Sequence, residues 1–94
     1  MADYQVKCIR RDGSDIDRRI DRLGGTAPDG STWNDTVDTV IQYIRNGQHR
    51  FWTSVNGKSV WVIVRLHPTS SRYYLATEND GFPPNNLLNL PECP

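Results

Sequence analysis

Apolar and polar residues alternate at the start of the chain, which predicts a β-strand with one face inward. Tyr4, Val6 and Cys8 fall on one face, and Gln5, Lys7 and Ile9 fall on the other. Residues 12–15 supply a turn, since Gly13 is free to adopt positive φ and aspartates bond nearby backbone.

A second strand, around 17–23, is expected to return antiparallel with Ile16 and Ile20 inward, and Gly24-Gly25 ends it. Its alternating charges are typical of an exposed or edge strand.

One helix is predicted in the middle of the chain. Residues 26–33 are rich in turn-forming types and are expected to be a loop. Asn34 or Asp35 can then cap a helix. Its apolar residues recur at helical spacing and form a single stripe, which consists of Val37, Val40, Ile41 and Ile44. Gly47 is expected to stop the helix, because a left-handed C-terminal cap favours glycine.

Asn56-Gly57 is the strongest hairpin signal, because both positions of the preferred two-residue turn need positive φ. It separates two strand-like runs, 50–55 and 58–66. The turn fixes the register, which pairs Val55 with Lys58, Thr53 with Val60, Trp52 with Trp61 and Phe51 with Val62. A looser turn over 67–71 leads to a last strand, roughly 72–77.

The C-terminal tail, residues 80–94, contains too much proline for a strand or helix of any length. It is nevertheless apolar, and four of its side chains are expected to pack on the sheet: Phe82, Leu87, Leu88 and Leu90. Burying each one gains about 1.5–3 kcal/mol. The elements together predict an α+β fold, in which an antiparallel sheet of four to five strands carries one amphipathic helix. We expect the order ββαβββ, an irregular tail, and a single domain over residues 1–94.

Several segments occur in a recognisable order along the chain. They are the strand 8–13, the glycines 24–25, Trp33 ahead of the helix, the segments 74–77 and 80–81, and the ending 85–93. In this order they resemble a family of small uncharacterised bacterial proteins, which is classified only as a domain of unknown function. The ending, with the pattern N-L-L-x-L-P-x-C, is the most specific part. The resemblance implies a single bacterial domain and brings no activity, ligand or functional residue with it.

The charges cancel over the whole chain, with eleven basic and eleven acidic residues, so no strong field attracts nucleic acid or anionic lipid. Their distribution is uneven. Between Asp38 and Glu78 there is no carboxylate, and this stretch holds five cations: Arg45, Arg50, Lys58, Arg65 and Arg72. The second half of the fold is therefore expected to be locally basic.

The first seven residues lack the layout of a secretory signal, and the longest apolar run, 60–64, is far shorter than the roughly 20 residues that span a bilayer. We therefore expect a cytoplasmic protein with no membrane partner. In that reducing compartment Cys8 and Cys93 are expected to be free thiols, with a disulfide between them as the alternative. The two cysteines with His49 and His67 offer no metal-ligand spacing, so we assign no metal.

The hairpin register places Arg50, Trp52, Trp61 and Arg65 on the sheet face opposite to the core. Three interpretations of this face are open. The tryptophans form a structural cross-strand pair, worth about 0.5–1.5 kcal/mol and roofed by the tail leucines; or the face binds a protein; or it stacks single-stranded nucleic-acid bases while the arginines meet phosphates. The structural interpretation is favoured, and a protein partner is favoured over nucleic acid.

Catalytic and metal motifs are missing from the sequence. Asp12, Asp15 and Asp17 lie near a glycine, but their spacing misses the calcium-loop pattern. No nucleophile elbow, phosphate loop or metalloprotease motif occurs, so we assign no catalytic residue and no cofactor. A non-catalytic binding or accessory module is the favoured function. A small enzyme is the other alternative, with only His49, His67 and the cysteines to support it, and the oligomeric state is left open.

Overall fold

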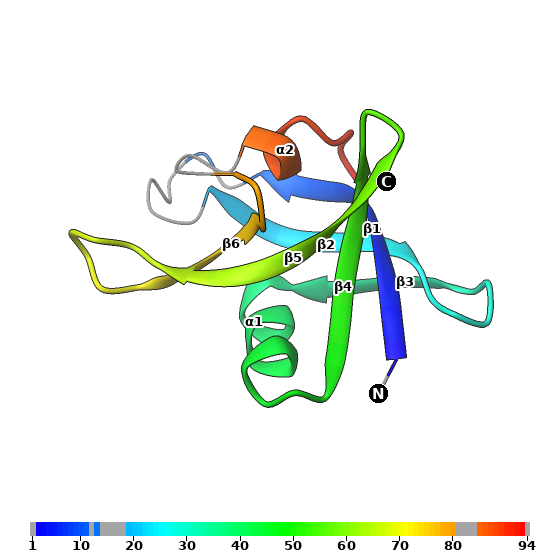
Figure 1. Cartoon of the computed structure of the whole chain (residues 1–94), viewed down its shortest axis with the longest axis horizontal. Coiled ribbons are helices and arrows are strands. Elements are labelled where there is room, and N and C mark those ends of the chain that lie inside the picture. The colour runs from blue at the N-terminus through cyan, green and yellow to red at the C-terminus, as the bar shows by residue number, and fades with distance from the viewer. Residues whose placement is uncertain (1, 12, 14–18, 81–84, 94) are drawn as a thin grey trace.

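The computed structural model describes residues 2–11, 13, 19–80 and 85–93. Within them, six strands form one sheet in the spatial order β3-β2-β1-β4-β5-β6, and one amphipathic helix, α1, packs against it (Figure 1). The elements are β1 (Ala2–Arg11), β2 (Ile20–Thr26), β3 (Thr32–Thr36), α1 (Val37–Arg45), β4 (His49–Val55), β5 (Lys58–Leu66), β6 (Tyr73–Thr77) and a single turn of helix, α2 (Asn85–Leu88). The α+β class is confirmed, but the predicted number of strands and the order ββαβββ are wrong.

The sheet is mixed, whereas the sequence predicted an antiparallel one. β1 pairs with β4 in parallel, from Ala2 opposite His49 to Gln5 opposite Trp52, and the other pairs of neighbouring strands are antiparallel. The reason is the crossover from β3 through α1 to β4, which passes over β2 and β1 and returns the chain in the same direction. Such a crossover also places α1 on one face of the sheet, where it covers the core.

The predicted loop 26–33 is partly strand. β2 continues through Gly24-Gly25 to Thr26, and β3 begins at Thr32 and pairs along β2. Only a short turn separates the two strands, and in it Asp29 accepts hydrogen bonds from the Ser31 hydroxyl (2.6 Å) and the Ser31 backbone N–H (3.0 Å). These hydrogen bonds hold the pKa of Asp29 below its ordinary value. β3 is short and polar, which is why the sequence pattern missed it.

Helix α1 begins later than predicted because Asn34 and Asp35 are paired with β2. Its N-cap is Thr36, whose hydroxyl accepts a hydrogen bond from the Thr39 backbone N–H at 3.2 Å. The predicted stop is confirmed, since Gly47 has a φ of 69° and its N–H donates to Ile44 O at 3.1 Å. The apolar stripe faces the core, with Val37, Val40 and Ile41 buried and Ile44 partly buried.

An extra residue in β1 changes which side chains face the core. The pairing with β2 passes from Val6 opposite Gly25 to Cys8 opposite Gly24, so Lys7 has no opposite residue. Because of this bulge, Ile9 follows Val6 into the core, and both are buried. Cys8, which the alternation placed inward, lies on the opposite face of the strand from Ile9. Ile20 of β2 is buried as predicted, while Ile16 and the three aspartates 12, 15 and 17 lie outside the described residues.

The Asn56-Gly57 hairpin is confirmed in turn and register. Both turn residues have positive φ, 53° and 82°. The four predicted pairs are present, including Trp52 opposite Trp61 and Phe51 opposite Val62. Phe51 and Val62 are buried on the inner face beneath α1.

The C-terminal tail pairs with the part of β1 that β4 does not reach. β4 pairs with β1 only as far as Gln5, and the Thr53 hydroxyl then donates to Val6 O at 2.9 Å. Beyond this point the tail supplies the hydrogen bonds to this edge of β1. Ile9 N–H donates to Pro91 O (3.0 Å), and Cys93 N–H donates to Ile9 O (2.9 Å). Contrary to the prediction, the tail contains regular structure, with α2 and a bridge between Ile9 and Glu92.

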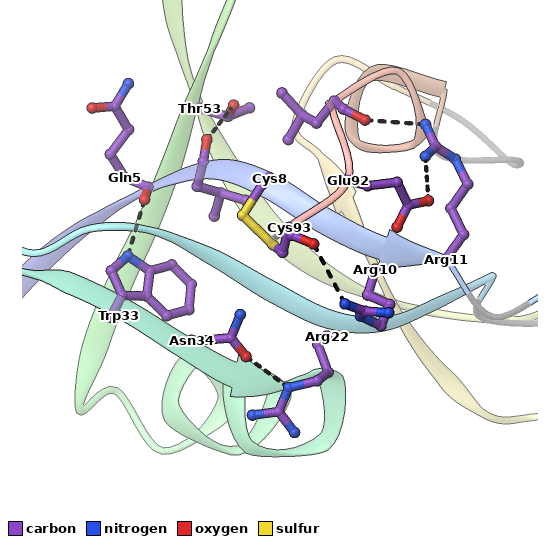
Figure 2. Close-up of a disulfide and its surroundings, with 12 residues drawn as sticks. Gln5, Cys8, Arg10, Arg11, Arg22, Trp33, Asn34, Thr53, Glu92 and Cys93 are labelled. Atoms are coloured by element: carbon purple, nitrogen blue, oxygen red, sulfur yellow. Dashed lines mark hydrogen bonds and ion pairs between the residues drawn. A yellow bond between two sulfur atoms is a disulfide. The ribbon is translucent and has the colours of Figure 1, made fainter.

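Two further contacts hold the tail in place. Leu87 is fully buried in the core, and Leu88 and Leu90 pack against it. Arg11 donates to the carbonyls of Leu88 and Leu90. It also donates to the Glu92 carboxylate at 2.7 Å (Figure 2). Phe82 lies outside the described residues. The leucines therefore close the end of the core between β6 and β1.

Cys8 and Cys93 form a disulfide, with their Cα atoms 4.9 Å apart (Figure 2). The expectation of two free thiols is therefore wrong. The two residues are 85 positions apart in sequence, and they meet only because the tail runs beside β1. Sequence spacing alone could not show this proximity.

We predict that Leu87→Ala lowers the free energy of unfolding by about 3 kcal/mol, because it removes a fully buried side chain and leaves a cavity. Chemical denaturation measures the effect. Leu66→Ala is the matched control, because Leu66 is 55% exposed, and its change should stay within about 0.5 kcal/mol. Equal effects of the two substitutions would contradict the docking of the tail.

Candidate functional site

The structure brings three of the four predicted site residues together on the outer face of β4 and β5. Trp52 and Trp61 are directly opposite each other, and the Arg50 guanidinium lies 4.6 Å from the centre of the Trp61 ring. Arg50 also donates to both carboxylate oxygens of Asp3, at 2.8 and 3.0 Å. Arg50 is thus held in a fixed orientation over the indole by a two-point ion pair.

Arg65 has a separate role. It lies four residues beyond Trp61 on the same strand, a separation of about 13 Å at the usual rise of an extended chain. Its guanidinium donates to Glu78 O at 3.4 Å, and the Glu78 carboxylate accepts from the backbone N–H of Trp61 at 3.3 Å. Arg65 therefore supports the β5–β6 end of the face.

Asp3 is the residue of this candidate site that sequence reasoning missed. It lies 47 positions from Arg50, and only the parallel pairing of β1 with β4 places the two opposite each other. Because Asp3 neutralises Arg50, this arginine is no longer an unpaired cation for a phosphate. The electrostatic basis of the nucleic-acid interpretation is therefore weakened at this face.

Trp61 is 38% exposed and separates two shallow hollows. One, about 260 Å³, is lined by Asp3, Trp52, Ser59, Val60 and Trp61. The other, about 250 Å³, reaches past Arg50 to Gly47 and Ile44 at the end of α1. The described tail residues pack on β1 and β6 instead, so the idea that they roof the tryptophan pair is wrong. We call this surface the tryptophan face, made of Asp3, Arg50, Trp52 and Trp61.

A second candidate site lies on the inner side of the sheet. A hollow of about 110 Å³ is lined by Tyr4, Trp33, Asp35, Tyr43, His49 and Phe51, and we call it the aromatic hollow. These residues come from β1, β3, α1 and β4. Sequence reasoning missed this group, because its members are spread over nearly fifty positions and β3 was predicted to be the end of a loop and the start of the helix.

Trp33 reaches the aromatic hollow by lying across Gly25. The two residues are paired between β3 and β2, and the indole N–H donates to Gln5 O of β1 at 3.0 Å (Figure 2). A Cβ atom on Gly25 would stand 1.9 Å from the same carbonyl oxygen. The missing side chain of Gly25 is therefore what allows the indole and the Gln5 carbonyl to meet.

The groups that supported the enzyme alternative have structural roles. Cys8 and Cys93 are consumed by the disulfide. His67 Nδ1 accepts hydrogen bonds from the backbone N–H groups of Thr69 and Ser70, at 3.2 and 3.3 Å, in the turn before β6. His49 packs between the rings of Tyr4 and Tyr43. These contacts give no arrangement of nucleophile, base and orienting group.

Within the described residues, the fold and these sites define a small mixed α+β domain with one amphipathic helix, a closed core, and hollows beside Trp61 and Trp33 that are lined by aromatic side chains. No helix in the described part of the chain has the length and apolar character to cross a membrane. The model of one protein family, described as a protein of unknown function (DUF3892), matches residues 5–91. The chain therefore belongs to this family, which confirms that it is a domain of unknown function. Neither the curated proteins nor the solved structures contain a match.

Proposed function

We propose that this protein is a non-catalytic binding module whose tryptophan face contacts a protein partner. The observation that supports the proposal is the Trp61 indole, which is exposed and yet held in place by Arg50. Tryptophan and arginine are the residues that most often carry binding energy in protein interfaces. A side chain that is already ordered loses little conformational entropy when a partner binds.

The two hollows beside Trp61 suit side chains of a partner, since well-packed pockets around an aromatic anchor exclude water. The ion pair between Arg50 and Asp3 adds no net charge to the face. A neutral aromatic surface favours a protein over a polyanion, whose affinity depends on unpaired cations. Arg65 contributes indirectly, through its contact with Glu78 at the end of the same face.

A photo-reactive amino acid at Ser59, which lines one hollow, tests the proposal in cells. We expect a discrete adduct with one protein, and purified partner should bind the native domain. Trp61→Ala should weaken that binding by about 2 kcal/mol or more, as at a hot spot. Leu66→Ala is the matched control, because it removes an exposed apolar residue at the other end of β5.

The same photo-reactive group at Ser70, in the turn before β6, is the positional control. Equal adducts at both positions, an adduct with nucleic acid, or binding that is indifferent to Trp61→Ala would overturn the proposal. An adduct with a second copy of the chain would also overturn it in favour of self-association.

The bacterial origin and the cytoplasmic location expected from the sequence are proposals as well. The Cys8–Cys93 disulfide bears on the second one, because such bonds persist mainly in oxidising compartments. Cell fractionation with detection of the protein tests the cytoplasmic proposal independently of the bond. Recovery in the cytoplasmic fraction supports the proposal, and recovery outside the cytoplasm contradicts it.

A further inference from the structure

We propose that the aromatic hollow binds a methylated ammonium group. This proposal is independent of the tryptophan face, because the hollow lies on the other side of the sheet and uses other residues, apart from its wall His49. Its ligand would be a headgroup with one positive charge and an apolar surface. Three features support this assignment: the aromatic walls, the unpaired carboxylate at the rim and the size of the space.

Aromatic rings that contact one another line the space. Phe51 is buried at the base, with the ring centres of Tyr4 and Trp33 at 5.4 and 5.3 Å from its own. His49 adds a further wall and packs on both tyrosines, with its ring centre 5.1 Å from that of Tyr4 and 4.7 Å from that of Tyr43. The π faces of tyrosine and tryptophan attract cations, and cages of such rings are the usual receptors for quaternary and methylated ammonium groups.

Asp35 supplies the negative charge that a bound ammonium group would face. It is the one acidic residue that lines the hollow, and its side chain has no salt bridge or hydrogen bond to any residue in the described ranges. His49 Nδ1, in the wall of the hollow, is also buried without a hydrogen-bond partner among the same residues. A half-buried carboxylate beside aromatic rings lacks a counter-charge, and a cation in the hollow would supply it.

The volume of the hollow fits a methylated ammonium group rather than a whole small molecule. Its volume, about 110 Å³, is well below the roughly 300–1,000 Å³ of sites that enclose a whole small molecule. It is close to the scale of an apolar cavity of about 150 Å³ that accepts benzene. An unmethylated ammonium is strongly hydrated and needs several acceptors, whereas methyl groups spread the charge over an apolar surface that fits ring faces.

The test compares choline with 3,3-dimethylbutanol, its uncharged carbon isostere, by NMR titration of the isotopically labelled protein. The signal of the Trp33 indole N–H reports on the hollow, and those of Trp52 and Trp61 serve as internal controls. We expect choline to move the Trp33 signal to saturation and to bind about tenfold more tightly than the isostere. A peptide with trimethyllysine and the same peptide with lysine distinguish a protein side chain from a free small molecule as the source of the headgroup.

Asp35→Asn removes the charge without changing the shape of the side chain, so it should weaken choline about fivefold or more and leave the isostere unchanged. Asp38→Asn is the matched control, since Asp38 lies three residues away on the exposed side of α1 and outside the hollow. Equal binding of choline and its isostere would reduce the hollow to an apolar cavity. No movement of the Trp33 signal at tens of millimolar choline would show a closed aromatic core. Either result overturns the proposal.

Discussion

Replacing Gly25 with alanine is expected to unfold most of the protein. The added Cβ would lie 1.9 Å from Gln5 O and 2.9 Å from Lys7 N, both of which are backbone atoms of β1 that cannot rotate away. Relief requires β1 and β2 to separate, and this would also displace Trp33 from its hydrogen bond to Gln5 O. We expect a loss of about 4 kcal/mol or more, at the upper end of single substitutions and comparable to the whole stability of many small domains.

Circular dichroism and chemical denaturation measure this effect. The matched control is Gly13→Ala, because a Cβ at Gly13 would meet no atom within 4 Å and the residue shows no positive φ. The control should change stability by less than about 1 kcal/mol. A folded Gly25→Ala variant of nearly native stability would mean that β1 and β2 do not approach each other as closely as described.

Reducing the Cys8–Cys93 disulfide is expected to lower the free energy of unfolding by about 4 kcal/mol. The bond joins residues 85 positions apart, so it restricts nearly the whole unfolded chain, and the loss of this restriction favours unfolding. It also ties the tail to β1 beside the Ile9 hydrogen bonds. Urea denaturation with and without a thiol reductant measures the change.

The control for reduction is the double variant Cys8→Ala with Cys93→Ala, which should already have the lower stability and show no further response to the reductant. Intact mass after alkylation in denaturant gives the number of thiols in the native protein independently. A native protein with two free thiols and a denaturation midpoint indifferent to the reductant would contradict the disulfide.

Local chemistry predicted those parts of the fold that depend on near neighbours. The Asn56-Gly57 turn fixed the β4–β5 register, and Gly47 ended the helix, because both need φ values that few other residues adopt readily. β3 was missed because its residues, Thr-Trp-Asn-Asp-Thr, carry turn and cap signals that compete with strand formation. A strand missed before the helix reverses the direction in which the strands after the helix are expected to run relative to β1. The parallel pairing of β4 with β1 was therefore missed too.

The same error limited the prediction of the sites. Trp52, Trp61 and Arg50 were grouped correctly because one hairpin holds them. Asp3, which fixes Arg50, belongs to a strand that only the parallel pairing brings near. The aromatic hollow needs β1, β3, α1 and β4 at once, so no local pattern could have shown it.

The sequence by itself determined the class of the fold, the helix with its apolar stripe, the hairpin register and the docking of the tail leucines, but not the part of the fold on which they pack. These features follow from periodicity, turn chemistry and the gain from burying apolar surface. Only the tertiary structure decided the strand order, the Cys8–Cys93 bond, the ion pair that holds Arg50 and the hollow beneath Trp33. Each of these depends on contacts between residues far apart in the chain, which arise from packing and leave no periodic signal.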